Sequence, residues 1–435
     1  MFFQKEIETM PREDIKLLQQ ARLRQTLRRV YDRVPLYRER FEALKLRPED
    51  IRTAEDLQEL PFTVKDDLRK NYPFGTFAAD KKDIVRIHAS SGTTGKPTVV
   101  GYTRNDLDVW SDLVARLAMA TGVTKEDTVQ ISFGYGLFTG AFGLHQGLEK
   151  IGCAVIPMSS GNTEKQLMLM QDFEPTVLVA TPSYAVYLSE AIAEQGIADK
   201  IKIKIGLFGA EGCTTEMRQI IEKNMNILAT DNYGMSELIG PGVAGECYLR
   251  KGMHLAEDHF IAEIIDPETG RVLPEGEFGE LVITSLTKEA FPIIRYRTRD
   301  ITRLVTAPCE CGRTHARIDK IRGRSDDMLI IKGVNVFPSQ VESVLVSLGD
   351  IGIAPHYQLV LRKKGVMDAL EVVVELLDGS MLESFTALES IQTTIHEKLR
   401  SVLGLDCKVT LVSPKTIERS TGKAKRVIDL RNEKK

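Results

Sequence analysis

Residues 88–103 read HASSGTTGKPTVVGYT, a run of glycine, serine and threonine with one lysine between two apolar stretches. Small residues let a backbone approach a ligand closely, and hydroxyl and N–H groups donate hydrogen bonds to anions. Lys96 adds a positive charge. This composition favours a loop that holds phosphate, and the alternative is an ordinary surface loop, since Gly/Ser/Thr runs are usually loops.

The common phosphate loop of NTPases does not fit this stretch. Its pattern, G-x-x-x-x-G-K-[ST], requires a hydroxyl residue directly after the lysine. Here Pro97 follows Lys96, and Ser90 stands where the first glycine would be. The sequence therefore excludes an ordinary P-loop NTPase.

Size and composition narrow the class of protein. The chain has 435 residues, 43% of them hydrophobic and 27% charged, as is typical of a globular protein of two or three domains. A net charge of −3 gives no electrostatic reason to expect nucleic acid or an anionic membrane as a partner. Because the N-terminal stretch has no apolar signal core and no apolar run reaches membrane-spanning length, we expect a cytoplasmic protein with reduced cysteines.

The elements that must position this loop follow from the hydrophobic pattern. A charged amphipathic helix is expected at residues 11–30. Short β-branched runs then alternate with helical stretches such as 183–195; the runs are 128–133, 153–158, 176–180, 203–209 and 226–231. This alternation predicts βαβ units and a mainly parallel sheet, with ligands at the carboxyl ends of its strands.

The pattern changes after about residue 245. Two alternating apolar runs around a Pro/Gly turn predict β structure, and the last 100 or so residues predict a small α+β unit with a helix near 384–402. The sequence thus predicts an α/β fold. A large N-terminal domain, 1–324, would hold the βαβ sheet and a β subdomain, and a small mobile α+β C-terminal domain, 325–435, would follow a hinge.

Five further stretches line up with the first one. They are FGAEG (208–212), DNYGMSE (231–237), YRTRD (296–300), GRSDDMLIIKGVNVFPSQVE (323–342) and ERSTGKAKR (418–426). Their order and spacing resemble the adenylate-forming superfamily of acyl-CoA synthetases. More narrowly, FGYGLFTGAFG (133–143) and RVPLYRERF (33–41) resemble the phenylacetate–CoA ligase family, and the resemblance covers nearly the whole chain.

This resemblance implies an AMP-forming acid–thiol ligase that uses ATP, Mg²⁺ and CoA. The carboxylate of a small aryl acid, such as phenylacetate, would attack the α-phosphate of ATP and release pyrophosphate. The thiol of CoA would then displace AMP from the acyl-adenylate. Two alternatives remain open, namely an enzyme that loads the acid on a carrier-protein thiol and a non-catalytic nucleotide sensor. A homodimer is a further expectation.

The resemblance also assigns roles to single residues. Lys423, with Lys425 as its rival, would bind the carboxylate and the α-phosphate during adenylation. Glu237 would hold Mg²⁺, for which a carboxylate oxygen is a suitable ligand. Nucleotide contacts are implied for Ser90, Ser91, Gly92, Thr93, Thr94, Gly95, Lys96, Gly209, Ala210, Glu211, Asp231, Asn232, Tyr233, Gly234, Met235, Asp300 and Arg324.

The acid is expected to lie against aromatic side chains. Tyr135 and Phe138 would supply flat apolar walls, and Gly140 and Ala210 would leave room beside them. Lys65 is a further candidate for contacting the carboxylate or the adenylate. The alternatives are that the aromatic residues only pack a strand–helix junction and that Lys65 is a plain surface lysine.

Three more residues concern the second half-reaction. The superfamily rotates its C-terminal domain between the two steps, and Asp326 resembles its hinge residue. Lys332 and Gly333 would then line the path of the pantetheine arm of CoA.

The stretch TAPCECGRTH (306–315) is not shared by the whole superfamily. Two cysteines one residue apart suggest metal ligation by a tight turn, and structural zinc takes four N/S ligands. The expected ligands are Cys247, His254, Cys309 and Cys311, with His315 and His259 as rivals for the histidine. Because the spacing departs from C-x₂₋₄-C, a plain turn with reduced cysteines is the alternative, although related ligases keep a similar segment.

Overall fold

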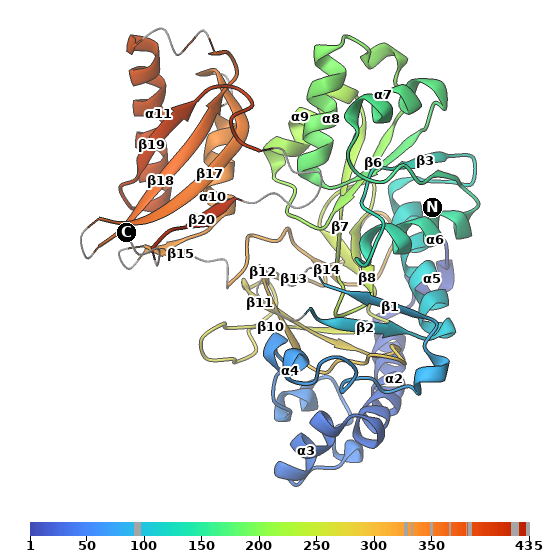
Figure 1. Ribbon diagram of the computed structural model, residues 1–435. Helices are drawn as coiled ribbons and strands as arrows, with labels where there is room; N and C mark the ends of the chain where they lie inside the picture. Colours follow the sequence, from blue (N-terminus) through green and yellow to red (C-terminus); the bar gives the residue numbers. More distant parts are fainter. Residues whose placement is uncertain are drawn as a thin grey trace. The chain divides into compact units, whose positions relative to one another are not determined.

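The computed structural model describes residues 1–90, 97–325, 329–331, 334–348, 351–364, 367–379, 381, 385–418 and 426–431 (Figure 1). The chain divides into two compact units. The first contains Met1–Ala180, Gly196–Ala210 and Asn226–Ile321, and the second contains Thr181–Gln195, Glu211–Met225 and Arg322–Lys435. The α/β fold is confirmed, and the domain boundary at 324/325 stays a prediction.

A nine-stranded sheet forms the centre of the first unit, in the order β13-β14-β9-β8-β7-β6-β5-β3-β4. The parallel half comprises β3 (Thr128–Ile131), β4 (Ala154–Ile156), β5 (Val177–Ala180), β6 (Ile205–Gly209) and β7 (Leu228–Met235). These strands are the five predicted β-branched runs, so the parallel sheet is confirmed for this half.

The other half of this sheet is antiparallel. It comprises β8 (Gly240–Glu246), β9 (Met253–Leu255), β13 (Leu304–Val305) and β14 (Arg317–Ile318). Part of the region assigned by sequence to separate β structure therefore extends the main sheet instead. Antiparallel neighbours need no crossover helix, so a short connection is enough to reverse the chain after β7.

Smaller β elements complete the first unit. The strands β10 (Phe260–Ile265), β11 (Gly279–Ser285) and β12 (Tyr296–Thr302) form an antiparallel three-stranded sheet, which confirms the two predicted alternating runs. The strands β1 (Arg86–Ala89) and β2 (Val99–Tyr102) form a hairpin. The Gly/Ser/Thr stretch stands in the sequence between these two strands.

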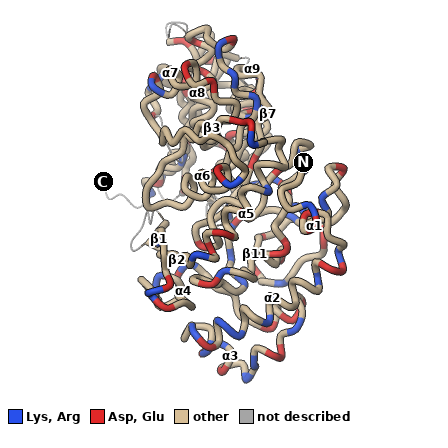
Figure 2. The backbone as a smooth tube through the Cα atoms, turned by 90° about the vertical axis from the view of Figure 1, so that its right-hand side faces the viewer, with Lys and Arg blue, Asp and Glu red and all other residues tan. Residues whose placement is uncertain are grey.

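The helices of the first unit are α1 (Lys5–Glu8), α2 (Arg12–Arg33), α3 (Pro35–Ala43), α4 (Lys65–Lys70), α5 (Arg104–Thr121), α6 (Gly140–Ile151) and α7 (Thr163–Asp172). The expected N-terminal helix is confirmed as α2, and basic and acidic residues are mixed along α2 and α3 (Figure 2). At the start of α5, Thr103 and Asp106 cap each other's backbone N–H groups, which fixes where this helix begins.

The second unit has a four-stranded sheet in the order β19-β18-β17-β20. Its elements are α8 (Pro182–Glu194), α9 (Thr215–Met225), β15 (Leu329–Ile331), β16 (Val334–Val336), α10 (Pro338–Ser347), β17 (Ile353–Lys364), β18 (Met367–Leu376), α11 (Phe385–Leu403), β19 (Lys408–Val412) and β20 (Val427–Asp429). The helices predicted at 183–195 and 384–402 are thereby confirmed. Buried aliphatic residues of α10, α11 and the four strands form its core.

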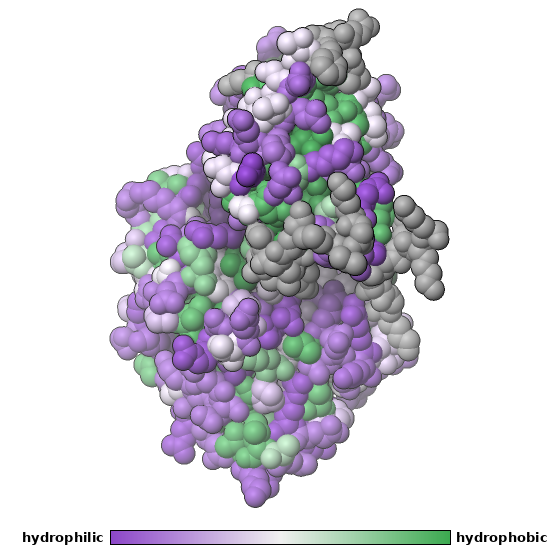
Figure 3. All heavy atoms as spheres, turned by 90° about the vertical axis from the view of Figure 1, so that its left-hand side faces the viewer, coloured by the Kyte–Doolittle hydropathy of each residue, from purple (hydrophilic) through white to green (hydrophobic). Residues whose placement is uncertain are grey.

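Hydrophilic residues cover most of the face shown in Figure 3, with smaller hydrophobic patches between them. Among the helices that the structure describes, none has both the length and the apolar character needed to cross a membrane.

Lys288 places a buried amine beside the main core. Trp110 on α5 stacks on Tyr102, with ring centres 5.0 Å apart, and Lys288 Nζ lies 3.1 Å from the centre of the Tyr102 ring. This Nζ has no hydrogen-bond partner among the described residues. Burial lowers the pKa of Lys288 to about 7, because the low-dielectric core disfavours the charged form.

We expect Lys288→Met to stabilise the protein at pH 7. In the unfolded chain the pKa of a lysine is about 10.4, so the unfolded state binds more protons between pH 7 and pH 10. The free-energy cost of burying the cation is therefore largest below pH 7 and falls by up to about 1.4 kcal/mol per pH unit above it. Urea unfolding should show that the advantage of the variant shrinks towards pH 10. An advantage that does not change with pH would contradict a titrating buried amine.

Candidate functional site

Ser90 and Thr98, which flank most of the Gly/Ser/Thr stretch, are joined by two hydrogen bonds at the end of the β1–β2 hairpin. The N–H of Ser90 donates to Thr98 O at 2.9 Å, and the N–H of Thr98 donates to Ser90 Oγ at 3.1 Å. The N–H of Ala89 reaches Leu137 O at 3.0 Å, which links the hairpin to the 133–143 stretch. Residues 91–96 lie outside the described residues; they include the predicted contacts Ser91, Gly92, Thr93, Thr94, Gly95 and Lys96.

The carboxyl ends of β6 and β7 lie side by side, with Gly209 paired with Asn232. The Asn232 amide donates to Phe208 O at 2.6 Å, so its side chain bridges the two strands. Ala210 follows β6 in a left-handed conformation with φ of 72°, which turns the chain sharply at this edge. Several predicted nucleotide contacts are thus adjacent, at the edge where parallel sheets bind ligands.

The strand β7 is also fastened to β8 and β12. Buried Glu246 of β8 accepts the N–H of Asp231 at 2.9 Å. The hydroxyl of Tyr233 donates to Asp300 Oδ2 on β12 at 2.6 Å. The structure therefore brings the predicted ribose ligand Asp300 against the DNYGMSE stretch, although the two are far apart in the sequence.

Glu237 lies in the β7–β8 connection with its side chain only 5% exposed. Lys65 Nζ, at the start of α4, is 3.9 Å from Glu237 Oε1, so these two candidates are neighbours. Beside them, the hydroxyls of Ser236 and Thr139 are 3.1 Å apart. Sequence analysis had not singled out this hydroxyl pair, although Ser236 stands inside the YGMSE motif and Thr139 inside FGYGLFTGAFG.

Arg324 and Glu211 belong to the second unit. Glu211 Oε1 accepts the N–H of Ser183 at 2.7 Å, in the first turn of α8, where a carboxylate also complements the helix dipole. Arg324 is partly buried. The remaining candidates Asp326, Lys332, Gly333, Lys423 and Lys425 lie outside the described residues.

The expected acid-binding aromatic residues differ in their surroundings. The hydroxyl of Tyr135 lies 2.8 Å from His145 Nδ1, and its ring packs edge-on against Phe142. Burial raises the pKa of Tyr135. Phe138 is 48% exposed. A Cβ on Gly140 would come within 2.4 Å of the Phe133 ring, so this ring already fills the room expected beside Gly140.

Cys247, His254, Cys309 and Cys311 come together in the first unit, with ligand atoms within 4.8 Å of one another. The Sγ atoms of Cys247 and Cys309 are 4.0 Å apart, and Cys311 Sγ is 3.4 Å from His254 Nε2. A tetrahedral zinc ion would set these separations at about 3.8 Å and about 3.6 Å, given its usual bond lengths. Three thiols and one imidazole therefore fit a closed zinc site in both donor type and spacing.

The two rival histidines are engaged elsewhere. His315 uses its ring nitrogens on Leu255 O and Ile7 O, each at 3.0 Å. His259 contacts the Thr287 hydroxyl at 2.7 Å and an Asp258 carboxylate oxygen at 3.0 Å. This leaves His254 as the histidine whose Nε2 faces a cysteine.

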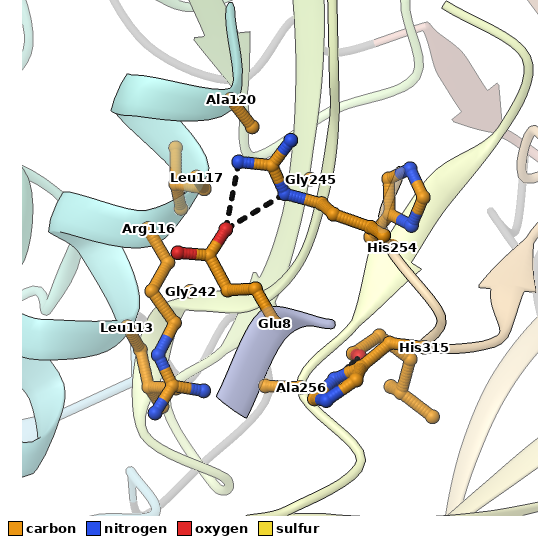
Figure 4. Close-up of a pocket in the computed structure, with 12 residues that line it drawn as sticks. Glu8, Leu113, Arg116, Leu117, Ala120, Gly242, Gly245, His254, Ala256 and His315 are labelled. Atoms are coloured by element: carbon orange, nitrogen blue, oxygen red, sulfur yellow. Dashed lines mark hydrogen bonds and ion pairs between the residues drawn. The ribbon is translucent and has the colours of Figure 1, made fainter. Parts of the chain in front are cut away.

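The cysteine segment is tied to the N-terminal residues beside a cavity of about 40 Å³ (Figure 4). Buried Glu8 accepts from Arg313 Nε at 2.7 Å, and the Arg313 guanidinium also donates to Met1 O. His254 and His315 line the same cavity. These bonds join the segment that carries the cysteines to Met1 and Glu8 of the N-terminal segment.

Comparisons with known proteins show the family to which the chain belongs. The family model described as "AMP-binding enzyme" matches residues 13–287, and "AMP-binding enzyme C-terminal domain" matches residues 333–431. The chain is 46% identical to the phenylacetate-coenzyme A ligase of Thermus thermophilus, over 99% of this chain and 100% of that protein. It is 48% identical to the phenylacetate-coenzyme A ligase of Escherichia coli, over 98% and 97%.

A solved structure is similar over almost the same length. A crystal structure of 2-hydroxyisobutyryl-CoA ligase in complex with an acyl-AMP has a TM-score of 0.90 and 28% identity, and the match covers 98% of this chain and 91% of that one. The chain therefore belongs to the AMP-binding, adenylate-forming enzymes, and within them to the phenylacetate-coenzyme A ligase family.

We expect Gly234→Ala to lower the free energy of unfolding by at least about 1–3 kcal/mol, the usual cost of overpacking. A Cβ on Gly234 would lie 1.9 Å from Gly240 O, and backbone cannot move away as a flexible side chain can. Gly212→Ala is the matched control, since a Cβ there meets nothing within 4 Å. Equal urea midpoints for the two variants would contradict this close β7–β8 approach.

Proposed function

We propose that this protein activates a small aryl carboxylic acid, phenylacetate or a close relative, as an acyl-adenylate and transfers the acyl group to CoA. The observation that carries the proposal is the identity of 46–48% with phenylacetate-coenzyme A ligases over nearly the full length of both chains. The adjacency of Lys65 to Glu237 and of Tyr233 to Asp300 supports it, since these residues lie in the stretches that resemble the family motifs.

The first half-reaction needs several groups around ATP. The substrate carboxylate attacks the α-phosphate, and pyrophosphate leaves. In our proposal residues 90–96 hold the leaving phosphates through hydroxyls and N–H groups, and Asp300 accepts bonds from the two ribose hydroxyls. Glu237 is the proposed ligand for Mg²⁺, which would offset phosphate charge. Lys65 Nζ, 3.9 Å from Glu237, adds a second cation beside this position.

In the second half-reaction, the residues of the C-terminal domain that face the acyl-adenylate would change. Lys423 would bind the carboxylate and the α-phosphate while two anions approach, and would then leave with the rotation of the C-terminal domain about Asp326. Lys332 and Gly333 would come to line the CoA arm. These roles rest on the family resemblance and remain proposals.

The acceptor, the oligomer and the compartment are also part of the proposal. Free CoA is the acceptor in the names of the relatives, and no described residue specifically favours a carrier protein. ATP and CoA are cytoplasmic co-substrates, which fits the expected location. A homodimer remains a prediction.

An acid screen tests the proposed substrate. We expect CoA-dependent AMP release to be fastest with phenylacetate or a similar aryl acid, and several aryl acids to react at graded rates. An apolar pocket distinguishes one methylene by only about 1–3 kcal/mol. Tyr135→Ala should reduce the preference for aryl over short aliphatic acids, with Tyr187→Ala as a tyrosine control outside the stretch. A higher kcat/KM for aliphatic acids in the wild type would overturn the aryl assignment.

We also propose that Cys247, His254, Cys309 and Cys311 bind one structural zinc ion. The donor set of three thiols and one imidazole supports this, as do the 4.0 Å and 3.4 Å separations. All four ligand positions would be filled by protein, so the role would be in folding and not in the reaction. In the bound site the thiols are thiolates, and the ion would join the end of β8 to β9 and the cysteine turn.

Metal analysis of the purified protein should find about one zinc per chain. Cys309→Ser should lose the ion and melt at a lower temperature, because one thiolate ligand is gone. Cys153→Ser is the matched control, since both cysteines are 7% exposed and Cys153 lies outside the cluster. If Cys309→Ser keeps the metal content and melting temperature of the wild type, the segment is a plain turn.

A further inference from the structure

The segment that bears Lys423 is tied to the second unit at both ends. At the upstream end, the N–H of Ile417 donates to Glu375 Oε1 at 2.6 Å. At the downstream end, Arg426 Nη2 donates to Glu342 Oε1 at 2.8 Å. Only residues 418–425 separate these two ends. Two buried carboxylates, from β18 and α10, therefore set where the Lys423 segment leaves the domain and returns to it.

The downstream end has three separate contacts. The Arg426 guanidinium lies 4.5 Å from the centre of the Tyr357 ring and bonds to Glu342. The carbonyl of Arg426 accepts the N–H of Leu359 at 2.8 Å. The hydroxyl of Tyr357 donates to Pro338 O at 3.0 Å, which ties this ring to the start of α10. Arg426 is thus fixed by an ion pair with Glu342, a cation–π contact with Tyr357 and a backbone hydrogen bond with Leu359.

The Glu342–Arg426 pair is largely removed from solvent, with side chains 11% and 18% exposed. Burial raises the pKa of Glu342, and the Arg426 charge opposes that rise. Removing one partner leaves the other as an uncompensated, partly buried charge, so the pair acts as a unit.

Arg426 is the first described residue after the segment that carries Lys423, so its contacts set where that segment joins β20. The strand β20 is three residues long and lies at the edge of the four-stranded sheet, where it pairs in parallel with β17 only. An edge strand of this length contributes few ladder hydrogen bonds. Without the Arg426 side-chain contacts, the nearest fixed point downstream of Lys423 would be β20.

We propose that Glu342 and Arg426 are positioning residues for the adenylation half-reaction, because they fix the segment that carries Lys423. This inference rests on the proposed function, in which Lys423 binds the reacting carboxylate and α-phosphate. A misplacement of about 1 Å at a reacting group can cost about 10²-fold in rate. The second half-reaction does not use Lys423, so it does not depend on the pair.

The test separates the two half-reactions. Arg426→Ala and Glu342→Ala should each lower the rate of phenylacetate-dependent ATP–pyrophosphate exchange about 10- to 100-fold. Thioester formation from preformed phenylacetyl-adenylate and CoA should stay at the wild-type rate. The double variant should lose no more than either single variant, because partners in one pair are not additive. Arg426→Lys, which keeps the charge, should retain part of the exchange activity and serves as the test variant if Arg426→Ala does not fold.

Two reference variants make the result decisive. Lys423→Ala should show the same split in a stronger form. Arg362→Ala, which removes a different ion pair of the same sheet at 3.6 Å from Glu371, should leave both half-reactions unchanged. Equal losses in both half-reactions for Arg426→Ala, no loss in either, or additive losses in the double variant would overturn the positioning role.

Failure of the proposed function would look different. In that case the wild type itself would catalyse no aryl-acid-dependent exchange, or Lys423→Ala would affect both half-reactions equally. The positioning role would then be overturned together with its premise.

Discussion

The position of β7 between a parallel and an antiparallel neighbour is the constraint on which the candidate nucleotide site depends. On one side β6 runs parallel and brings Gly209 beside Asn232. On the other side the chain turns back at once into β8, with the backbone of Gly234 packed directly on Gly240. A connection this tight leaves Glu237 at the carboxyl edge of the parallel strands. Ligands of open sheets bind at such an edge, where neighbouring strands diverge in their connections.

Buried carboxylates carry out a second common task, which is to accept backbone N–H groups where the sheet ladders leave them unpaired. Asp106 accepts from Thr103, Glu289 and Ala290 and so joins the start of α5 to the β11–β12 connection. Glu246 does the same for Asp231 of β7. An unpaired buried N–H group costs about as much as a lost hydrogen bond, so each of these acids stabilises a backbone position that sheet pairing leaves without a partner.

Some of these elements could be predicted from the sequence, and others could not. The five parallel strands were predictable because each lies in a short run of apolar and β-branched residues, and β5 and β6 are buried along their whole length. The strand β8 was not, since GPGVAGE has three glycines and one β-branched residue, and only pairing with β7 and β9 makes it a strand. The four candidate zinc ligands could be named from residue type. By contrast, Lys288 gave no signal, because nothing in its neighbours along the chain indicates burial against Tyr102.

The contacts of Arg426 show why other parts of the site could not be predicted from the sequence alone. In sequence it ends the basic run KAKR, which has the composition of a solvated tail, whereas in the structure it meets a carboxylate from α10 and a ring from β17. In our proposal the Lys423 segment takes part in one half-reaction and withdraws in the other, and such a segment cannot be packed permanently into an apolar core. It can, however, be fixed at its ends. Polar and cation–π contacts at Glu375, Glu342 and Tyr357 hold those two ends, at Ile417 and Arg426, on the C-terminal sheet and α10.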